Sequence, residues 1–149
     1  MLQKTEWYTG FMHPQSHFGF REVAHTADWE LEVWAPDLGT LLVQAARGMY
    51  HLAEAKLSSH PRLNRKIEFS FQEPETLLID FLTELIFLTE SEGLAFDKYE
   101  LQFEGDQLIA LISGAELESI SKEIKAATYH NLIIRESERG LIANIVFDV

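Results

Sequence analysis

The apolar residues of this chain follow two different periods, and that pattern limits the possible folds more than any other feature. Spacings of three and four residues, which are typical of an amphipathic helix, occur in two segments. Most other segments alternate with the period of two that is typical of strands. The pattern differs from the regular strand–helix alternation of a doubly wound sheet. It predicts a compact single-domain α+β fold, in which two amphipathic helices pack on a mostly antiparallel β-sheet.

The two helical segments carry start and stop signals. The first follows Pro36, and Asp37 is its expected N-cap. The second has Pro74 in its first turn, beside acidic residues at the positive end of the helix dipole, and Gly93 is its expected terminator. Each helix therefore has one apolar face to bury. The predicted faces are Leu38, Leu41, Leu42, Ala45, Ala46, Met49, Leu52 and Ala53 in the first helix, and Leu77, Leu78, Phe81, Leu82, Leu85 and Ile86 in the second.

Alternation predicts strands along much of the remaining chain. Residues 108–112 are apolar at every position, so we expect that strand to be buried on both faces. Residues 104–107, Glu-Gly-Asp-Gln, are typical of a hairpin turn between two strands. The predicted strands are residues 29–34, 67–72, 99–103, 108–112, 124–135 and 141–149.

Composition excludes several classes of function. Twenty-four acidic residues against twelve basic ones give a formal charge of −12, which opposes an electrostatic grip on nucleic acid. The absence of cysteine rules out disulfides, thiolate nucleophiles, zinc fingers and iron–sulfur sites. The HExxH, GxSxG and Walker signatures of common hydrolases and nucleotide-binding proteins are also missing. Since no apolar run could span a bilayer and no signal peptide is evident, we expect a cytoplasmic protein.

Chain length and the first residues indicate the domain organisation. The 149 residues are enough for one domain with a sizeable core. Residues 1–18 contain Gly10, Pro14 and scattered aromatic side chains without a regular period. They are predicted to form a flexible N-terminal arm, and residues 19–149 the domain itself.

Acidic groups at two distant places could form a metal site. The segment His25-Thr26-Ala27-Asp28 precedes the strand that starts at Trp29, and the chain ends with Asp148 and the free α-carboxylate of Val149. If the strand at Trp29 lies beside the terminal strand, Asp28 joins the other two carboxylates. Such a group would need a hard cation such as Ca²⁺, Mg²⁺ or Mn²⁺ to offset its repulsion. On the residues alone, a turn and a solvated terminus are simpler interpretations.

A third polar segment lies within a predicted strand. Residues 123–130 read Glu-Ile-Lys-Ala-Ala-Thr-Tyr-His, and alternation puts Lys125, Ala127 and Tyr129 on one face. Thr128 and His130 would share the other face. A lysine and a tyrosine on one face can bind an anion, pair with an acid or transfer a proton. The simpler alternative is an exposed face with a snorkelling lysine.

Together and in this order, HTAD at residues 25–28, EIKAATYHNL at residues 123–132 and the final Asp-Val resemble the archease family. The resemblance covers the chain from about Gly19 to Val149. It implies a small α+β protein that activates the tRNA-splicing RNA ligase, which joins RNA 3′-phosphate and 5′-hydroxyl ends with GTP and a divalent metal. Such a protein is a chaperone-like helper and not an enzyme. It would promote guanylylation of the ligase and multiple turnover, with RNA contacted only through that partner and no membrane involved.

The resemblance also implies roles for individual residues. Asp28 and Asp148 match the family's metal-binding acids, and Val149 would add its terminal carboxylate. Lys125 matches a lysine that is important for activation. Residues 114–121 are expected to form a loop that departs from many relatives, because Ala115 falls where they have a glutamate and no histidine follows, although Glu118 could replace a later acid. The remaining shared residues, expected on the activation or partner surface, are His25, Thr128, Tyr129 and His130.

Three other functions stay open at this stage. A freestanding metal-dependent phosphoester hydrolase would use His25 as a base, with Asp28 and Asp148 holding a water-activating ion. A structural binding module would use the ion only to fix the chain end. An RNA-binding adaptor would need a basic stripe or an aromatic platform, and the sequence shows neither.

Overall fold

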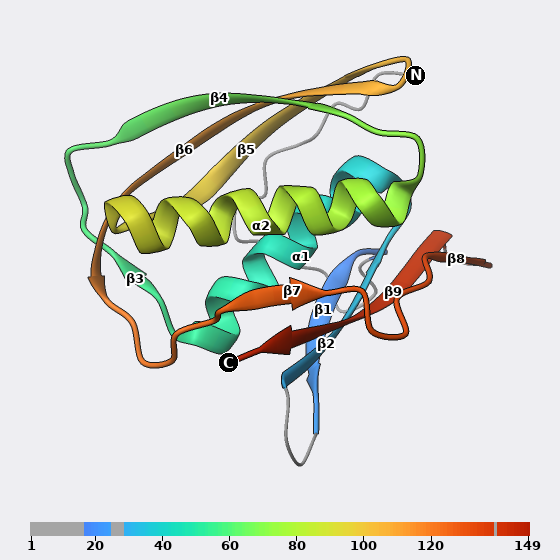
Figure 1. Ribbon diagram of the computed structural model, residues 1–149, viewed down its shortest axis with the longest axis horizontal. Helices are drawn as coiled ribbons and strands as arrows, with labels where there is room; N and C mark the ends of the chain where they lie inside the picture. The colour runs from blue at the N-terminus through green and yellow to red at the C-terminus, as the bar shows by residue number, and fades with distance from the viewer. Residues whose placement is uncertain (1–16, 25–28, 139) are drawn as a thin grey trace.

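The computed structural model describes residues 17–24, 29–138 and 140–149, which form two helices and two antiparallel sheets around one hydrophobic core (Figure 1). This arrangement confirms the predicted α+β class. Most of the predicted N-terminal arm lies outside the described residues. The elements are β1 (Gly19–Val23), β2 (Trp29–Ala35), α1 (Leu38–Ala53), β3 (Lys56–Leu57), β4 (Leu63–Ser70), α2 (Pro74–Glu92), β5 (Leu94–Glu104), β6 (Gln107–Ser119), β7 (Ala126–Thr128), β8 (Arg135–Ser137) and β9 (Gly140–Asp148).

Both helices form where the sequence predicts them. The Asp37 side chain caps α1 by accepting a hydrogen bond from the Thr40 amide, with 2.8 Å between nitrogen and oxygen. α2 has Pro74 in its first turn and ends at Gly93, which has a left-handed φ of 68°. Among the described residues, neither helix is long and apolar enough to cross a membrane.

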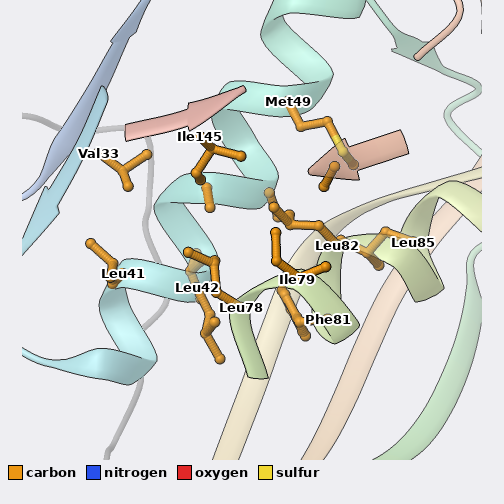
Figure 2. Close-up of a cluster of buried hydrophobic side chains, with 14 of the residues drawn as sticks. Val33, Leu41, Leu42, Met49, Leu78, Ile79, Phe81, Leu82, Leu85 and Ile145 are labelled. Carbon is orange, nitrogen blue, oxygen red and sulfur yellow. The ribbon is translucent and has the colours of Figure 1, made fainter. Parts of the chain in front are cut away.

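The centre of the core lies where the two helices meet. Figure 2 shows Leu42 and Met49 of α1 close to Leu78, Leu82 and Leu85 of α2. None of these five side chains is more than 2 % exposed. Burying each contributes about 1.5–3 kcal/mol, so this contact is a main source of stability.

The five-stranded sheet, called sheet A below, has the order β1-β2-β9-β7, and β8 also pairs with β9. Ile145, Val146 and Phe147 of β9 are all buried. Successive strand residues point to opposite faces, so this part of β9 is covered on both faces. Gly48 lets α1 approach β2 closely, because a Cβ there would lie 2.5 Å from Cδ2 of Leu31.

The four-stranded sheet, called sheet B below, has β6 at its centre, with β5 on one side and β3 and β4 on the other. The predicted hairpin turn joins β5 to β6, and Gly105 takes a φ of 63° there. Every second residue of β4 is exposed, so sheet B covers the helices with one face only. Gly114 lies opposite a register shift in β5, where a Cβ would collide with the Ala95 carbonyl.

Two expectations about sheet B are wrong. The strand at residues 108–112 is not buried on both faces, because Leu111 is 44 % exposed on a face that no described element covers. The expected loop at residues 114–121 is largely strand, since β6 continues to Ser119 and pairs there with β3 and β5. Long-range pairing, which local composition does not reveal, decides both outcomes.

The predicted continuous strand at residues 124–135 is also wrong. β7 ends at Thr128 and β8 begins at Arg135. Between them the Ile134 amide donates a hydrogen bond to Glu75 of α2, with 2.9 Å between nitrogen and Oε2. That contact holds the connecting segment at the start of α2, so the segment does not pair with β9.

Candidate functional site

The end of β9 lies between two strands that adjoin the predicted site segments (Figure 1). Phe147 pairs with Trp29 of β2 on one side and with Ala127 of β7 on the other. Neighbouring strands lie about 4.8 Å apart, so segments distant in the sequence meet here. The adjacency of the Trp29 strand and the terminal strand, on which the metal-site hypothesis depends, is therefore confirmed.

Lys125 and Asp148 are joined through their backbones. The Lys125 amide donates a hydrogen bond to the Asp148 carbonyl, with 2.8 Å between nitrogen and oxygen. Both side chains are exposed, whereas that of Val149 is half-buried and packs against the core. A basic and an acidic side chain thus reach solvent at the end of a buried strand.

Thr128 positions the neighbouring residues of the motif. Its hydroxyl donates a hydrogen bond to the Val146 carbonyl, with 2.8 Å between the oxygens, and accepts one from the His130 amide at 3.3 Å. The chain leaves the sheet here, and both Tyr129 and His130 are exposed. These two side chains are therefore available to a ligand or a protein partner.

The predicted common face of Lys125, Ala127 and Tyr129 is wrong. Ala127 is 8 % exposed and belongs to the core, whereas Tyr129 is 54 % exposed. Strand alternation cannot extend to Tyr129, because β7 ends at Thr128.

His25 and Asp28 lie outside the described residues, so the meeting of Asp28 with Asp148 and Val149 stays a prediction. Asp28 directly precedes Trp29, the residue that pairs with Phe147. Within the described residues, no group of three or more His, Cys, Asp or Glu side chains could hold a metal ion. A carboxylate site here would therefore need Asp28 or the terminal carboxylate as well as Asp148.

Lys122 is a member of this region that the sequence analysis missed. Its Nζ lies 5.3 Å from the centroid of a Trp29 ring, which makes a cation–π contact. The amides of Ser121 and Lys122 donate to the Ala53 carbonyl at the end of α1, at 2.9 and 3.2 Å. Trp29 is so distant in the sequence that no spacing rule identifies the pair.

Trp29 also lines a cleft of about 660 Å³ whose basic residues include Arg47, His51 and Lys56. Acidic and basic residues are mixed along its wall, and none of the predicted site residues that the structure describes lines it. Tyr50 borders the cleft, and burial raises the pKa of its hydroxyl far above the ordinary value. This phenol is therefore neutral at physiological pH.

The fold and the site define a class of small α+β proteins, with two helices on antiparallel sheets and a polar group at the end of the C-terminal strand. Residues 20–149 match the model of the Archease protein family (MTH1598/TM1083). Protein archease of Methanopyrus kandleri is 29 % identical over 138 residues, which cover 87 % of this chain and 99 % of that protein. Protein archease of Aeropyrum pernix is 30 % identical over 142 residues, which cover 88 % and 97 %.

A solved structure agrees with these matches. The crystal structure of an archease from Thermotoga maritima, described as a possible chaperone, matches with a TM-score of 0.66 and 25 % identity. The match covers 87 % of this chain and 96 % of that one. This chain belongs to the archease family.

Proposed function

We propose that this protein is a chaperone-like activator of the tRNA-splicing RNA ligase and not itself an enzyme. It would promote transfer of a guanylyl group from GTP to the ligase and so support repeated turnover. Family membership supports this role. The observation that carries the proposal is the pairing of β9 with both β2 and β7, which joins Lys125 to Asp148 and sets Trp29 opposite Phe147.

The proposed metal site consists of Asp28, Asp148 and the α-carboxylate of Val149, around one divalent cation. Carboxylate oxygens are ligands for Ca²⁺, Mg²⁺ or Mn²⁺. The Trp29–Phe147 pairing supports this assignment, because Asp28 is the residue before Trp29 and Asp148 the residue after Phe147. Lys125 would contact the guanylate or its phosphate and partly balance the acidic group.

The proposed partner surface surrounds Lys125 and includes His25, Thr128, Tyr129 and His130. Tyr129 and Ile133 are 54 % and 60 % exposed, so the surface has apolar as well as polar contacts to offer, as protein interfaces do. A net charge of −12 favours association with a basic RNA-binding enzyme and opposes direct binding of RNA.

A guanylylation assay tests the proposal. The cognate ligase would be incubated with GTP and limiting divalent metal, with and without this protein, and the ligase–guanylate adduct measured over time. Wild-type protein should accelerate adduct formation, and Lys125→Ala should abolish the acceleration. Lys98→Ala is the matched control, because Lys98 is an exposed lysine on β5 of the other sheet. No acceleration by wild-type protein would refute the proposal, and phosphoester turnover by the protein alone would favour the hydrolase.

Calorimetric titration with Ca²⁺, Mg²⁺ and Mn²⁺ tests the metal site separately. Asp28→Asn and Asp148→Asn should each weaken binding, whereas Asp106→Asn, at the exposed turn between β5 and β6, should leave it unchanged. Unchanged affinity in both site variants would remove this site while leaving the activator role to the guanylylation assay.

A further inference from the structure

Among the described residues, β4 is an edge strand of sheet B, and its outer row of backbone groups pairs with no other strand. It is eight residues long, contains no proline and pairs with β6 on one side without a register shift. From the described part of the chain, the one hydrogen bond to its outer edge comes from its own Arg65, which donates to the Asn64 carbonyl at 3.1 Å. A long, straight edge strand is a template for pairing with another chain.

The ladder with β6 fixes which groups face outward. The Phe71 amide donates to the Asp106 carbonyl at 2.9 Å, so every second residue from Phe71 back to Leu63 bonds to β6. The intervening residues direct their amides and carbonyls to the free edge. Their side chains lie on the exposed face of the sheet. These outward-facing residues are Asn64, Lys66, Glu68 and Ser70.

The outward-facing residues are complementary to a second copy of themselves. In an antiparallel pair centred on Ile67, Lys66 of each copy lies opposite Glu68 of the other, and Asn64 lies opposite Ser70. Opposite charges across such a pair are stabilising and like charges are destabilising. Moving the axis by one residue either way sets Lys66 against Lys66 or Glu68 against Glu68. Charge therefore selects the register centred on Ile67.

α2 adds an exposed aromatic side chain at the level of this axis. Arg65 bonds to Glu92 near the end of α2, with 2.6 Å between Nη2 and Oε1, and the rings of Phe69 and Phe81 lie 6.0 Å apart. The helix residues level with the middle of β4 therefore fall between Phe81 and Glu92. Phe87 lies in that interval and is 55 % exposed.

We propose that this protein forms a symmetric dimer through the outer edge of β4, in antiparallel register centred on Ile67. The dimer joins two copies of sheet B into one continuous sheet. α2 separates β4 from the strands around Lys125, so the proposed ligase-binding surface stays open (Figure 1). The proposal is therefore independent of the proposed function. The β5 edge is less suited to pairing, because a bulge between Phe96 and Lys98 disturbs it.

Sedimentation velocity over a range of concentrations tests the dimer. Wild-type protein should dimerise, and Lys66→Glu should raise the dissociation constant about tenfold or more, because two attractive pairs per dimer become repulsive. The double variant Lys66→Glu/Glu68→Lys should restore dimerisation, since it exchanges the two partners. Lys98→Glu changes the net charge equally on the β5 edge and should leave the dissociation constant unchanged.

A second variant tests the backbone pairing itself. Glu68→Pro removes an outward amide without removing a bond to β6, so the fold should survive while dimerisation is lost. Circular dichroism and the thermal midpoint would check the fold. In the wild-type dimer, hydrogen exchange at the Lys66 and Glu68 amides should slow as concentration rises. The proposal would be overturned if the wild-type protein stayed monomeric at all concentrations, or if its dimer were insensitive to Glu68→Pro and to Lys66→Glu. A dimer that is weakened by Lys98→Glu alone would also overturn it and would assign the contact to β5.

Discussion

Sheets A and B are both antiparallel and both pack on the helices, but they end in different ways. In sheet A, β9 is buried from Ile145 to Phe147 and then ends in the exposed Asp148, beside Lys125 of the neighbouring segment. In sheet B, exposed and half-buried residues alternate along the whole of β4. Sheet A thus supports a polar site on a rigid strand, whereas sheet B covers the core and leaves an edge free. In this fold the proposed site lies at the end of the more deeply buried strand.

Substitutions at two phenylalanines should produce the largest effect and show this difference directly. Phe147→Ala in sheet A should destabilise the protein by about 3–5 kcal/mol, because the ring is fully buried. Phe103→Ala in sheet B should cost clearly less, since Phe103 is only half-buried. Urea unfolding of both variants measures the difference. Equal losses would mean that the two sheets contribute alike.

Two glycines should give the next largest effect. Gly114→Ala forces a Cβ against the Ala95 carbonyl and should cost about 1–3 kcal/mol, because backbone cannot move aside easily. The nearest atoms that Gly48→Ala meets belong to the side chains of Leu31 and Phe20, and the substitution gains about 1 kcal/mol of helix propensity. Its net loss should therefore be smaller. Chemical denaturation of both variants is the measurement, and the reverse order would contradict this account of the two close approaches.

Two buried tyrosines offer a finer comparison. The Tyr99 hydroxyl donates to the Phe96 carbonyl at 2.7 Å, so Tyr99→Phe should cost about 1 kcal/mol. The Tyr50 hydroxyl has no hydrogen-bond partner within the described residues, although Thr89 and the Phe96 backbone are near enough to lower its pKa somewhat. Tyr50→Phe should therefore leave stability unchanged or increase it. Thermal unfolding distinguishes the two, and a large loss at Tyr50 would indicate a missing partner.

The same tyrosines predict a loss of stability at alkaline pH. Burial raises the pKa of both Tyr50 and Tyr99. Above the ordinary tyrosine pKa of about 10, the unfolded chain releases protons that the folded chain keeps. The free energy of unfolding is therefore unaffected by these groups below that pH and decreases above it. Denaturant midpoints measured from neutral pH upward would show the decline. A double Tyr50→Phe/Tyr99→Phe variant should flatten the curve, and an unchanged slope would exclude these groups as the cause.

Substitutions at the polar end of sheet A should have the smallest effect on stability. Lys125→Ala and Asp148→Asn change exposed side chains and should alter the free energy of unfolding by no more than about 0.5 kcal/mol. The expected loss of ligase activation would then come from the site and not from the fold. Thermal unfolding checks this, and a marked drop in the midpoint would show that the two residues hold the strand end together.

The local sequence determined both helices and the main hairpin. Asp37, Pro74 and Gly93 are end signals that act within one turn of chain, and Gly105 permits its turn by itself. The apolar spacing chose the buried helix faces for the same reason, because residues three and four apart share a face in any helix. The motifs that suggest a site were also visible without a structure.

Only the tertiary structure decided which of those segments meet. Phe147 pairs with both Trp29 and Ala127, which lie far from it in the sequence. The contact of Lys122 with Trp29 and the exposure of Leu111 likewise depend on segments that are distant in the chain. Strand pairing is set by long-range hydrogen bonds and by which face finds a covering layer, and neither leaves a local signal. Residue types can therefore suggest which side chains form the proposed site, while the register of β9 determines which of them lie close together.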